Sequence, residues 1–225
     1  MRNLTLIIPA KFEKESLPIF LKEINKYSYK KIIVLKKSDK ETINSIKKNK
    51  KNYELLFQKG KGYGSAIIEG INKVNSEFCC IINADGSMNP KYLQQMLNLC
   101  SKKDLIFCSR YQGKNSGSSD DDLVTFIGNK IFSFLGNFLF SLNLSDILFT
   151  YILAKTRSLK KLNLKSKDFK LCIEIPIKAK KKNMIYSSLP CYERSRIGGK
   201  KKVNVLKDGL IILIYMIKLF FNYKK

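Results

Sequence analysis

Residues 53–66 read YELLFQKGKGYGSA, in which an apolar run, Tyr53–Phe57, passes through a lysine- and glycine-rich turn into a helix-like segment, Ser65–Val74. Glycine lets the backbone approach a ligand closely, and a helix N-terminus presents free N–H groups. The turn is therefore a candidate phosphate-binding loop. Its G-x-G-x-G spacing differs from the dinucleotide-binding fingerprint, and a plain tight turn is the alternative interpretation.

The same order of strand and helix repeats through the first half of the chain. Near-continuous apolar strands that alternate with helices predict an α/β fold, in which helices cover both faces of a mostly parallel sheet. Ligands of such sheets bind beyond the carboxyl ends of the strands. The predicted strands are Leu4–Ile8, Lys31–Leu35, Tyr53–Phe57, Phe78–Asn83 and Leu105–Cys108, and the predicted helices are Ser16–Tyr27, Lys40–Lys48, Ser65–Val74 and Pro90–Cys100.

Composition narrows the classes of protein that this chain can belong to. Its 225 residues, 44% hydrophobic and 27% charged, suit one large α/β domain with a tail and exclude wholesale disorder or a polytopic membrane protein. The net charge of +25 attracts the phosphates of nucleic acids, lipid headgroups or nucleotides. The absence of histidine excludes imidazole bases and His-ligated metals, and six cysteines without a CxxC pair predict reduced, mostly buried thiols.

The second half of the chain is less regular. A polar loop, Gln112–Asp122, ends in three aspartates and is followed by a long aromatic-rich segment, Leu123–Leu144. Met184–Cys191 predicts a late strand, and Arg194–Lys202 is a compact basic segment that contains glycine. The aspartates 120–122 could supply a general base to a hydroxyl acceptor, and a solvated loop or a helix N-cap is the favoured alternative.

The final apolar segment, Val203–Phe221, predicts a C-terminal amphipathic helix. Charged residues interrupt it, so it falls short of the roughly 20 predominantly apolar residues that span a bilayer. Leu210, Ile214 and Ile217 share one helical face, which would lie on a membrane or pack on the sheet. The lysines that could reach lipid headgroups are Lys207, Lys218, Lys224 and Lys225.

Asp85 is a candidate metal ligand. The apolar run that ends at Ile82 leads into Asn83-Ala84-Asp85 and then into a helix that begins at Pro90. A carboxylate at the carboxyl end of a strand can hold a divalent cation that bridges diphosphate oxygens. The alternative is an aspartate that caps its own turn or the following helix.

Five segments, in this order along the chain, resemble motifs of family 2 glycosyltransferases. IPAKFE at 8–13 resembles the opening P-x-x-x-E, GKGYG at 60–64 resembles G-K-G-x-G, and NAD at 83–85 stands where D-x-D stands. SRY at 109–111 looks like the family's G-S-R-Y, and RIGGKKK at 196–202 looks like the R-x-x-G-x-S-K segment of the dolichol-phosphate mannose synthase branch.

This resemblance implies a Rossmann-like GT-A domain over residues 1–202, followed by a membrane-interface helix over 203–225. It also implies a nucleotide-diphosphate sugar as donor, Mg²⁺ or Mn²⁺ at Asp85, and a polyprenyl phosphate as acceptor. Catalytic roles are expected for Asp85, Arg110, Arg196 and Lys202. The residues expected to bind the donor are Pro9, Ala10, Glu13, Asp39, Lys59, Gly60, Gly62, Asn83, Ala84 and Asp85. Those expected either to contact the acceptor or to support residues that do are Asp146, Glu174 and Gly199.

The implied acceptor suits the basic residues of these motifs. A lipid phosphate is already an anionic nucleophile, so it needs positioning and charge screening instead of a general base. Arginine can bind a phosphate through two parallel hydrogen bonds, which makes Arg110 and Arg196 the expected phosphate ligands together with Lys202. We therefore expect a cytoplasmic enzyme of the cell envelope, peripheral on the inner face of an anionic membrane.

Several positions depart from the family pattern and keep alternatives open. Asn83 replaces the first carboxylate of D-x-D, and Lys36 stands where the family has the aspartate that recognises the base, unless Asp39 substitutes for it. Thr150 replaces a glycine, and Lys201 replaces a serine. The alternatives are a degenerate member that only binds nucleotide sugar or lipid phosphate, and a transferase to a sugar hydroxyl. A nucleic-acid-binding module is disfavoured because the lysines, including the run 47–51, are spread over all segments.

Overall fold

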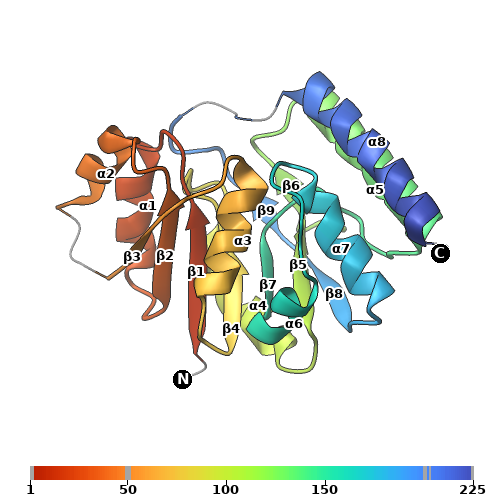
Figure 1. Cartoon of the computed structure of the whole chain (residues 1–225), viewed down its shortest axis with the longest axis horizontal. Coiled ribbons are helices and arrows are strands. Elements are labelled where there is room, and N and C mark those ends of the chain that lie inside the picture. The colour runs from red at the N-terminus through yellow and green to blue at the C-terminus, as the bar shows by residue number, and fades with distance from the viewer. Residues whose placement is uncertain (1–2, 49–51, 200–201, 203, 224–225) are drawn as a thin grey trace.

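A seven-stranded sheet in the order β3-β2-β1-β4-β7-β5-β8 forms the centre of the molecule (Figure 1). The computed structural model describes residues 3–48, 52–199, 202 and 204–223. All neighbouring strands pair in parallel except β7, which is antiparallel to both β4 and β5. The strands are β1 (Leu4–Pro9), β2 (Lys30–Leu35), β3 (Glu54–Phe57), β4 (Phe78–Ile81), β5 (Leu105–Ser109), β7 (Ile152–Lys155) and β8 (Tyr186–Pro190).

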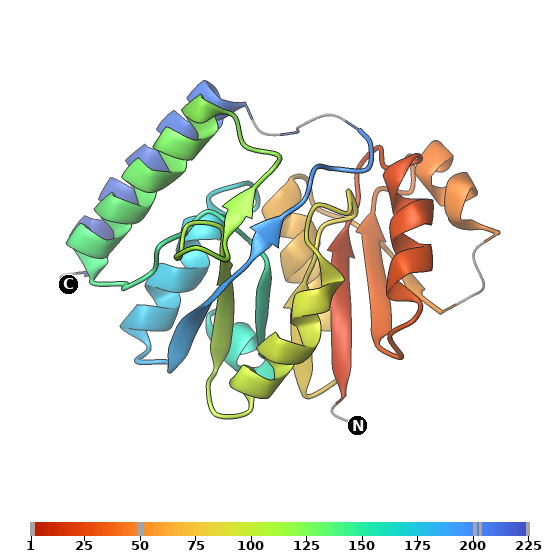
Figure 2. The ribbon, with the colours of Figure 1, turned by 180° about the vertical axis from the view of Figure 1, so that it is seen from behind.

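Helices cover both faces of this sheet, as the alternation of strands and helices predicts. One core cluster packs the sheet against α1 (Ser16–Ile24), α2 (Lys40–Ile46) and α4 (Leu93–Cys100), which follows the 3₁₀ turn η1 (Pro90–Tyr92). The other cluster packs it against α3 (Tyr63–Lys73), α6 (Thr156–Lys161) and α7 (Leu171–Lys181). Figure 1 shows the second set of helices in front of the sheet, and Figure 2 shows α1 and α4 from behind.

The expected elements of the first half are all present, with shifted ends. β4 stops at Ile81, so Asn83 lies in the loop beyond the strand. The Pro90–Cys100 segment divides into the turn η1 and α4. The sequence interpretation missed β7 and α6, and it placed a helix at α7, whose interior contains Pro176, only through the family resemblance at Glu174.

Two long helices stand apart from the sheet. α5 (Leu123–Phe140) and α8 (Val205–Tyr223) lie side by side beyond α7 in both views (Figures 1 and 2). Ile212 and Met216 of α8 are buried in the second core cluster, so this helix docks on α5 and α7 and not on the sheet itself. Within the described ranges, α5 is the one helix whose length and composition would suffice to cross a membrane.

A small two-stranded sheet pairs β6 (Gly117–Ser118) with β9 (Tyr192–Glu193). It joins the polar loop before α5 to the segment that leads into the basic residues 194–199. The expectations for Lys50, Lys51, Lys201, Val203, Lys224 and Lys225 concern positions outside the described residues.

Candidate active site

The first loop of the expected donor site follows β1. Pro9 and Ala10 are buried, and the Ala10 N–H donates to the carbonyl of Val34 at the end of β2, 2.9 Å away. The Glu13 N–H donates to Oγ1 of Thr42 at 2.9 Å, and the Glu13 carboxylate accepts from the Ser16 hydroxyl at 2.5 Å. The loop is therefore held to β2 and α2 on both sides, and Glu13 lies at the carboxyl edge of the sheet.

Asp39 lies beside the same loop, although no base-recognising aspartate occupies the position of Lys36. Its Oδ2 accepts from the Phe12 N–H at 2.7 Å, and its Oδ1 caps α2 through the Thr42 N–H at 3.3 Å. Phe12 has a positive φ of 55° and a largely exposed ring. Asp39 thus orients the exposed first loop, and recognition of a nucleobase by Asp39 stays a prediction.

The glycine-rich loop is held by the protein's own residues. The N–H groups of Lys59 and Gly60 donate to the Glu69 carboxylate at 2.8 and 2.9 Å. Lys36 donates to the carbonyls of Gln58, Lys59 and Gly60 from the other side. These backbone groups are therefore not directed at a phosphate, which corrects that part of the expectation for Lys59 and Gly60.

The glycines of this loop leave room for a neighbouring segment of the chain, where no side chain would fit. A Cβ on Gly62, whose φ is +97°, would lie 2.3 Å from the Lys167 carbonyl oxygen, and one on Gly64 would lie 2.2 Å from that of Ser166. The close approach expected for a ligand is thus made by residues 166–168. Gly62 shapes this edge of the sheet by accommodating the segment, and donor binding by Gly62 stays a prediction.

Glu174 holds the chain next to this segment in place. Its side chain is fully buried on α7 and accepts the N–H groups of Lys165 and Ser166 at 2.8 and 2.7 Å, with Lys178 at 2.6 Å. Burial alone would raise the pKa of Glu174, but Lys178 and the backbone donors outweigh it and hold the pKa below its usual value. Glu174 is therefore a supporting residue, which is one of the two roles expected for it, and the geometry directs its carboxylate at the protein's own backbone.

Asp85 and Asn83 lie in the loop after β4, where the sequence predicted them. The Asp85 Oδ1 accepts from the N–H and hydroxyl of Ser87 at 3.1 and 2.9 Å, and its Oδ2 lies 3.9 Å from the Arg196 guanidinium. Asn83 accepts from the Tyr63 hydroxyl at 2.9 Å. Ala84 is buried between them. Asp85 thus caps its own turn with one oxygen and directs the other toward the site.

The basic segment after β9 closes over this edge of the sheet. Arg196 makes a paired contact with Asp120, at 3.0 and 2.6 Å, and Lys202 donates to Glu13 at 2.8 Å. Gly199, with a φ of +77°, passes next to both Glu13 and Lys202. The hydrogen bond to Asp120 and the nearby carboxylates raise the pKa of Arg196 despite its partial burial. The loop therefore reaches Glu13 and Asp85, and its described cations, Arg194, Arg196 and Lys202, each have a carboxylate partner.

Arg110 lies in a buried cluster of three carboxylates. Its guanidinium binds Asp146 through two nitrogens, at 2.7 and 3.0 Å, and reaches Glu193 at 3.1 Å and Asp121 at 3.3 Å. The Arg110 side chain is 7% exposed, and Asp146 is almost wholly buried. Arg110 is therefore a structural cation, which corrects its expected role at a phosphate, and Asp146 supports Arg110, which is one of the two roles expected for Asp146.

A cavity of about 520 Å³ opens beside this cluster. Tyr111, Asp121, Phe126 and Lys130 contribute to its lining. Burial raises the pKa of the Glu193 carboxyl against the opposing effect of Arg110, and burial together with the hydrogen bond to Asp121 raises the pKa of the Tyr111 hydroxyl. The aspartates 120–122 are not a solvated loop, since two of them bind arginines, although Asp122 does cap α5 through the Thr125 N–H.

Sequence reasoning missed several residues that shape the site. Tyr63 joins Asn83 to Thr150 through its hydroxyl, at 2.9 and 2.6 Å, and Glu69 orders the glycine-rich loop. The available signals were weak: Tyr63 occupies the variable position of G-K-G-x-G, and Thr150 was noted only as a departure from glycine. Side chains that meet across 20 and 87 residues carry no local sequence pattern.

Residues 5–162 match Glycosyl transferase family 2. The match covers more than half of the chain, so the protein belongs to this family and is a glycosyltransferase. The expected enzyme class is thereby confirmed. The match does not distinguish the dolichol-phosphate mannose synthase branch from other members.

Solved structures share the fold. Glucosyl-3-phosphoglycerate synthase from Mycobacterium tuberculosis, in a complex with Mn²⁺, uridine diphosphate and glucosyl-3-phosphoglycerate, is 12% identical over 97% of this chain and 80% of its own, with a TM-score of 0.72. Mannosyl-3-phosphoglycerate synthase from Rubrobacter xylanophilus is 10% identical over 99% and 75%, with a TM-score of 0.69. These likenesses confirm the GT-A-like α/β fold.

Arg110→Met should lower the free energy of unfolding by about 3–5 kcal/mol, because it leaves Asp146 buried without its cation. Denaturant unfolding measures this loss. Arg157→Met, at an exposed arginine, is the matched control and should change stability little. An Arg110→Met protein of unchanged stability but raised KM for the donor would show that Arg110 binds substrate after all.

Glu174→Gln should destabilise the protein by about 1.5–3 kcal/mol at pH 7, because a buried charged acceptor of two N–H groups is lost. The pKa of Glu174 is lower in the folded state than the ordinary glutamate value of 4.5, so this contribution is full above pH 4.5 and disappears as the pH falls through the folded pKa. Thermal unfolding from pH 3 to 8 should show the gap to wild type closing at low pH. The exposed Glu77→Gln is the control.

Proposed function

We propose that this glycosyltransferase transfers a sugar from a nucleotide-diphosphate donor to a polyprenyl phosphate at the surface of an anionic membrane. The observation that carries the proposal is the segment 194–202. In this segment Arg196 binds Asp120 and lies near Asp85, and Lys202 binds Glu13. The chain then leads into α8, which has an exposed apolar face. A phosphate at headgroup depth would meet cations there while its hydrocarbon chain stayed with the apolar helix.

The donor is assigned to the loops at the carboxyl ends of β1 and β4. Glu13 and Asp85 face the same basic segment, so both loops border one site. The glycosyltransferase family and the uridine diphosphate in the mycobacterial synthase support a nucleotide donor. Asp39 and the exposed Phe12 border the space where the base would lie.

A divalent cation fits this site only if the substrate phosphates supply part of its coordination. Among the described residues no group of three or more acidic or cysteine side chains could hold a metal by itself. Mg²⁺ is commonly held by one or two carboxylates together with substrate phosphates, and the Oδ2 of Asp85 is available for this arrangement. When bound, the ion would screen the charge of the leaving diphosphate. The mycobacterial structure, with Mn²⁺ and uridine diphosphate together, supports the assignment.

The protein's own residues would then position the two phosphates. An oxygen of the acceptor phosphate attacks the anomeric carbon of the sugar, and the bond from that carbon to the nucleotide diphosphate breaks. No proton has to be removed from the acceptor, so the site needs cations more than a base. Arg196 and Lys202 supply them when substrate phosphates replace Asp120 and Glu13 as their partners.

A second candidate is transfer to the hydroxyl of a soluble acceptor. The observation that favours it is the cavity of about 520 Å³, where the Asp121 carboxylate, which accepts a hydrogen bond from the Tyr111 hydroxyl, could take a proton from the acceptor. Both synthases compared above are named for phosphoglycerate products, which are soluble. The acceptor assay described below separates the two candidates.

Asp85→Asn should abolish Mn²⁺-dependent binding of nucleotide diphosphate while leaving the fold intact, because Asp85 is a turn residue outside the core. Titration calorimetry with Mn²⁺ alone, nucleotide alone and both together measures this. Wild type should bind Mn²⁺ appreciably only when nucleotide is present. Glu54→Gln, at an exposed carboxylate, is the control, and equal metal-dependent binding by both variants would refute the assignment.

With polyprenyl phosphate in anionic vesicles and a panel of nucleotide sugars, wild type should form a glycosylated lipid phosphate detectable by mass spectrometry. Arg196→Lys should lower kcat by about 10²–10³-fold, because the ammonium lacks the planar fork. Asp120→Asn releases Arg196 without removing it and should cost far less. Product from 3-phosphoglycerate and none from the lipid would instead establish the soluble hydroxyl acceptor.

A further inference from the structure

The exposed apolar side chains of this protein are concentrated on two helices. Of the twenty large hydrophobic side chains that are exposed in the described chain, seven lie on α5 and seven on α8. On α5 they recur at helical spacing, and Phe134 and Phe138 are 67% and 76% exposed. Contiguous apolar patches of this kind mark interaction sites on soluble proteins.

α5 is apolar on one side and bonded to the domain on the other. The Asn129 amide donates to the Tyr111 hydroxyl at 2.7 Å, and the Ser133 hydroxyl accepts the Ile147 N–H at 3.2 Å. Asn137 both donates to and accepts from the backbone of Leu144. A helix that crosses a bilayer would have to withdraw these polar groups into hydrocarbon. The length and composition of α5 would allow a crossing, but its attachment to the domain by these hydrogen bonds disfavours one.

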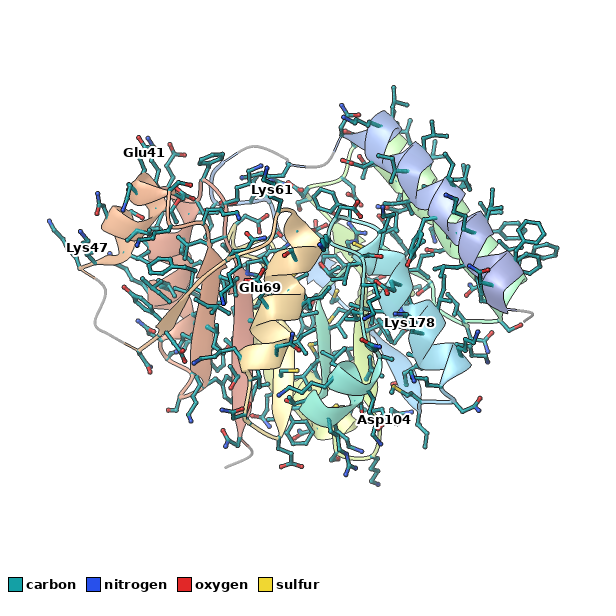
Figure 3. All side chains as sticks on the ribbon, in the orientation of Figure 1. Glu41, Lys47, Lys61, Glu69, Asp104 and Lys178 are labelled. Atoms are coloured by element: carbon teal, nitrogen blue, oxygen red, sulfur yellow. The ribbon has the colours of Figure 1, made fainter. Side chains whose placement is uncertain are left out.

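α8 extends this surface. It runs alongside α5, and Phe220 packs edge to face on Phe140 of α5 with ring centroids 6.0 Å apart. Side chains project from the side of α8 that faces away from the sheet (Figure 3). The surface, termed here the α5–α8 face, comprises Leu123, Val124, Ile127, Ile131, Phe134 and Phe138 together with Leu206, Leu210, Ile214, Ile217 and Phe221.

We propose that the α5–α8 face is a two-helix platform that lies in the plane of an anionic lipid surface, with α5 contributing as much of the contact as the C-terminal helix. Its apolar residues enter the boundary between headgroups and acyl chains, as those of interfacial helices do. The proposal does not depend on the identity of the acceptor.

Charge selects an anionic lipid surface over a second copy of the chain as the occupant. α5 contains no acidic residue, and the exposed Lys130, Lys207 and Lys218 lie on these two helices. The chain as a whole carries a net charge of +25, so two copies meeting face to face would repel each other. Anionic headgroups would instead attract each basic residue near the surface.

The platform also positions the active site. α5 begins directly after the aspartates that bond Arg110 and Arg196, and α8 begins three residues after Lys202. The N-terminal ends of both helices therefore adjoin the site. A protein bound through the α5–α8 face would hold Arg196 and Lys202 close to the headgroup layer.

Paired variants of exposed residues test the platform without donor or acceptor. Phe134→Ser with Phe138→Ser removes the α5 contribution, and Leu206→Ser with Leu210→Ser removes that of α8. Ile19→Ser with Ile185→Ser is the control, since these residues are 53% and 61% exposed elsewhere on the surface. In co-sedimentation with phosphatidylglycerol and phosphatidylcholine vesicles, each helix pair should lower the partition coefficient at least about tenfold, and the control should not.

Further measurements distinguish an anionic lipid surface from a neutral one, from a membrane-crossing helix and from a second copy of the chain. Thermal unfolding should show all three paired variants folded, and wild type should prefer phosphatidylglycerol vesicles and be released from them by alkaline carbonate. Undiminished binding of the α5 variant, equal binding to neutral vesicles, or resistance to carbonate would each overturn the platform. A wild-type dimer in sedimentation velocity that the α5 variant loses would assign the face to a second copy. Vesicle binding with no lipid product would leave the platform intact and refute the polyprenyl phosphate acceptor.

Discussion

The buried ion pair between Arg110 and Asp146 holds together segments from the second half of the chain. Arg110 directly follows β5, Asp146 lies before β7, Asp121 lies before α5, and Glu193 belongs to β9. One guanidinium thus joins four segments that are distant in sequence, and three carboxylates neutralise it in a region that excludes most water. Removing Arg110 would leave three carboxylates without their shared cation, so the cluster constrains where α5 starts and where the basic segment emerges.

The same internal pairing of charges extends across the active site. Arg196 is bound by Asp120, Lys202 by Glu13, and the glycine-rich loop by Glu69 and Lys36. Carboxylates and carbonyls of the protein hold the cations that substrate phosphates would otherwise contact. This arrangement stabilises a strongly basic chain before substrate binds. For the proposed function it also means that substrate phosphates bind by an exchange of partners, whose cost favours substrates that carry several negative charges.

Apolar surface defines the other side of the molecule. α5 and α8 bury narrow stripes against the domain, including Phe140, Ile212 and Met216, and leave wider apolar faces exposed. The polar anchors of α5 prevent it from separating from the domain. The active-site loops and the apolar helices are consequently attached to one another. The exposed apolar faces of α5 and α8 therefore keep a fixed position relative to the helix ends that adjoin the site.

The sequence by itself determined the α/β alternation, the positions of the loops after β1 and β4, and the amphipathic character of the C-terminal segment, because each depends on local periodicity and turn chemistry. The tertiary structure decided which residues are free to act. Arg110 and Glu174 matched family motifs, yet three carboxylates surround the first and two backbone N–H groups bind the second. Likewise, the exposed side of the apolar α5 could not be recognised before its polar side was seen to bond Tyr111 and Leu144. Partners of this kind meet only when distant segments pack, and no local pattern in the chain encodes them.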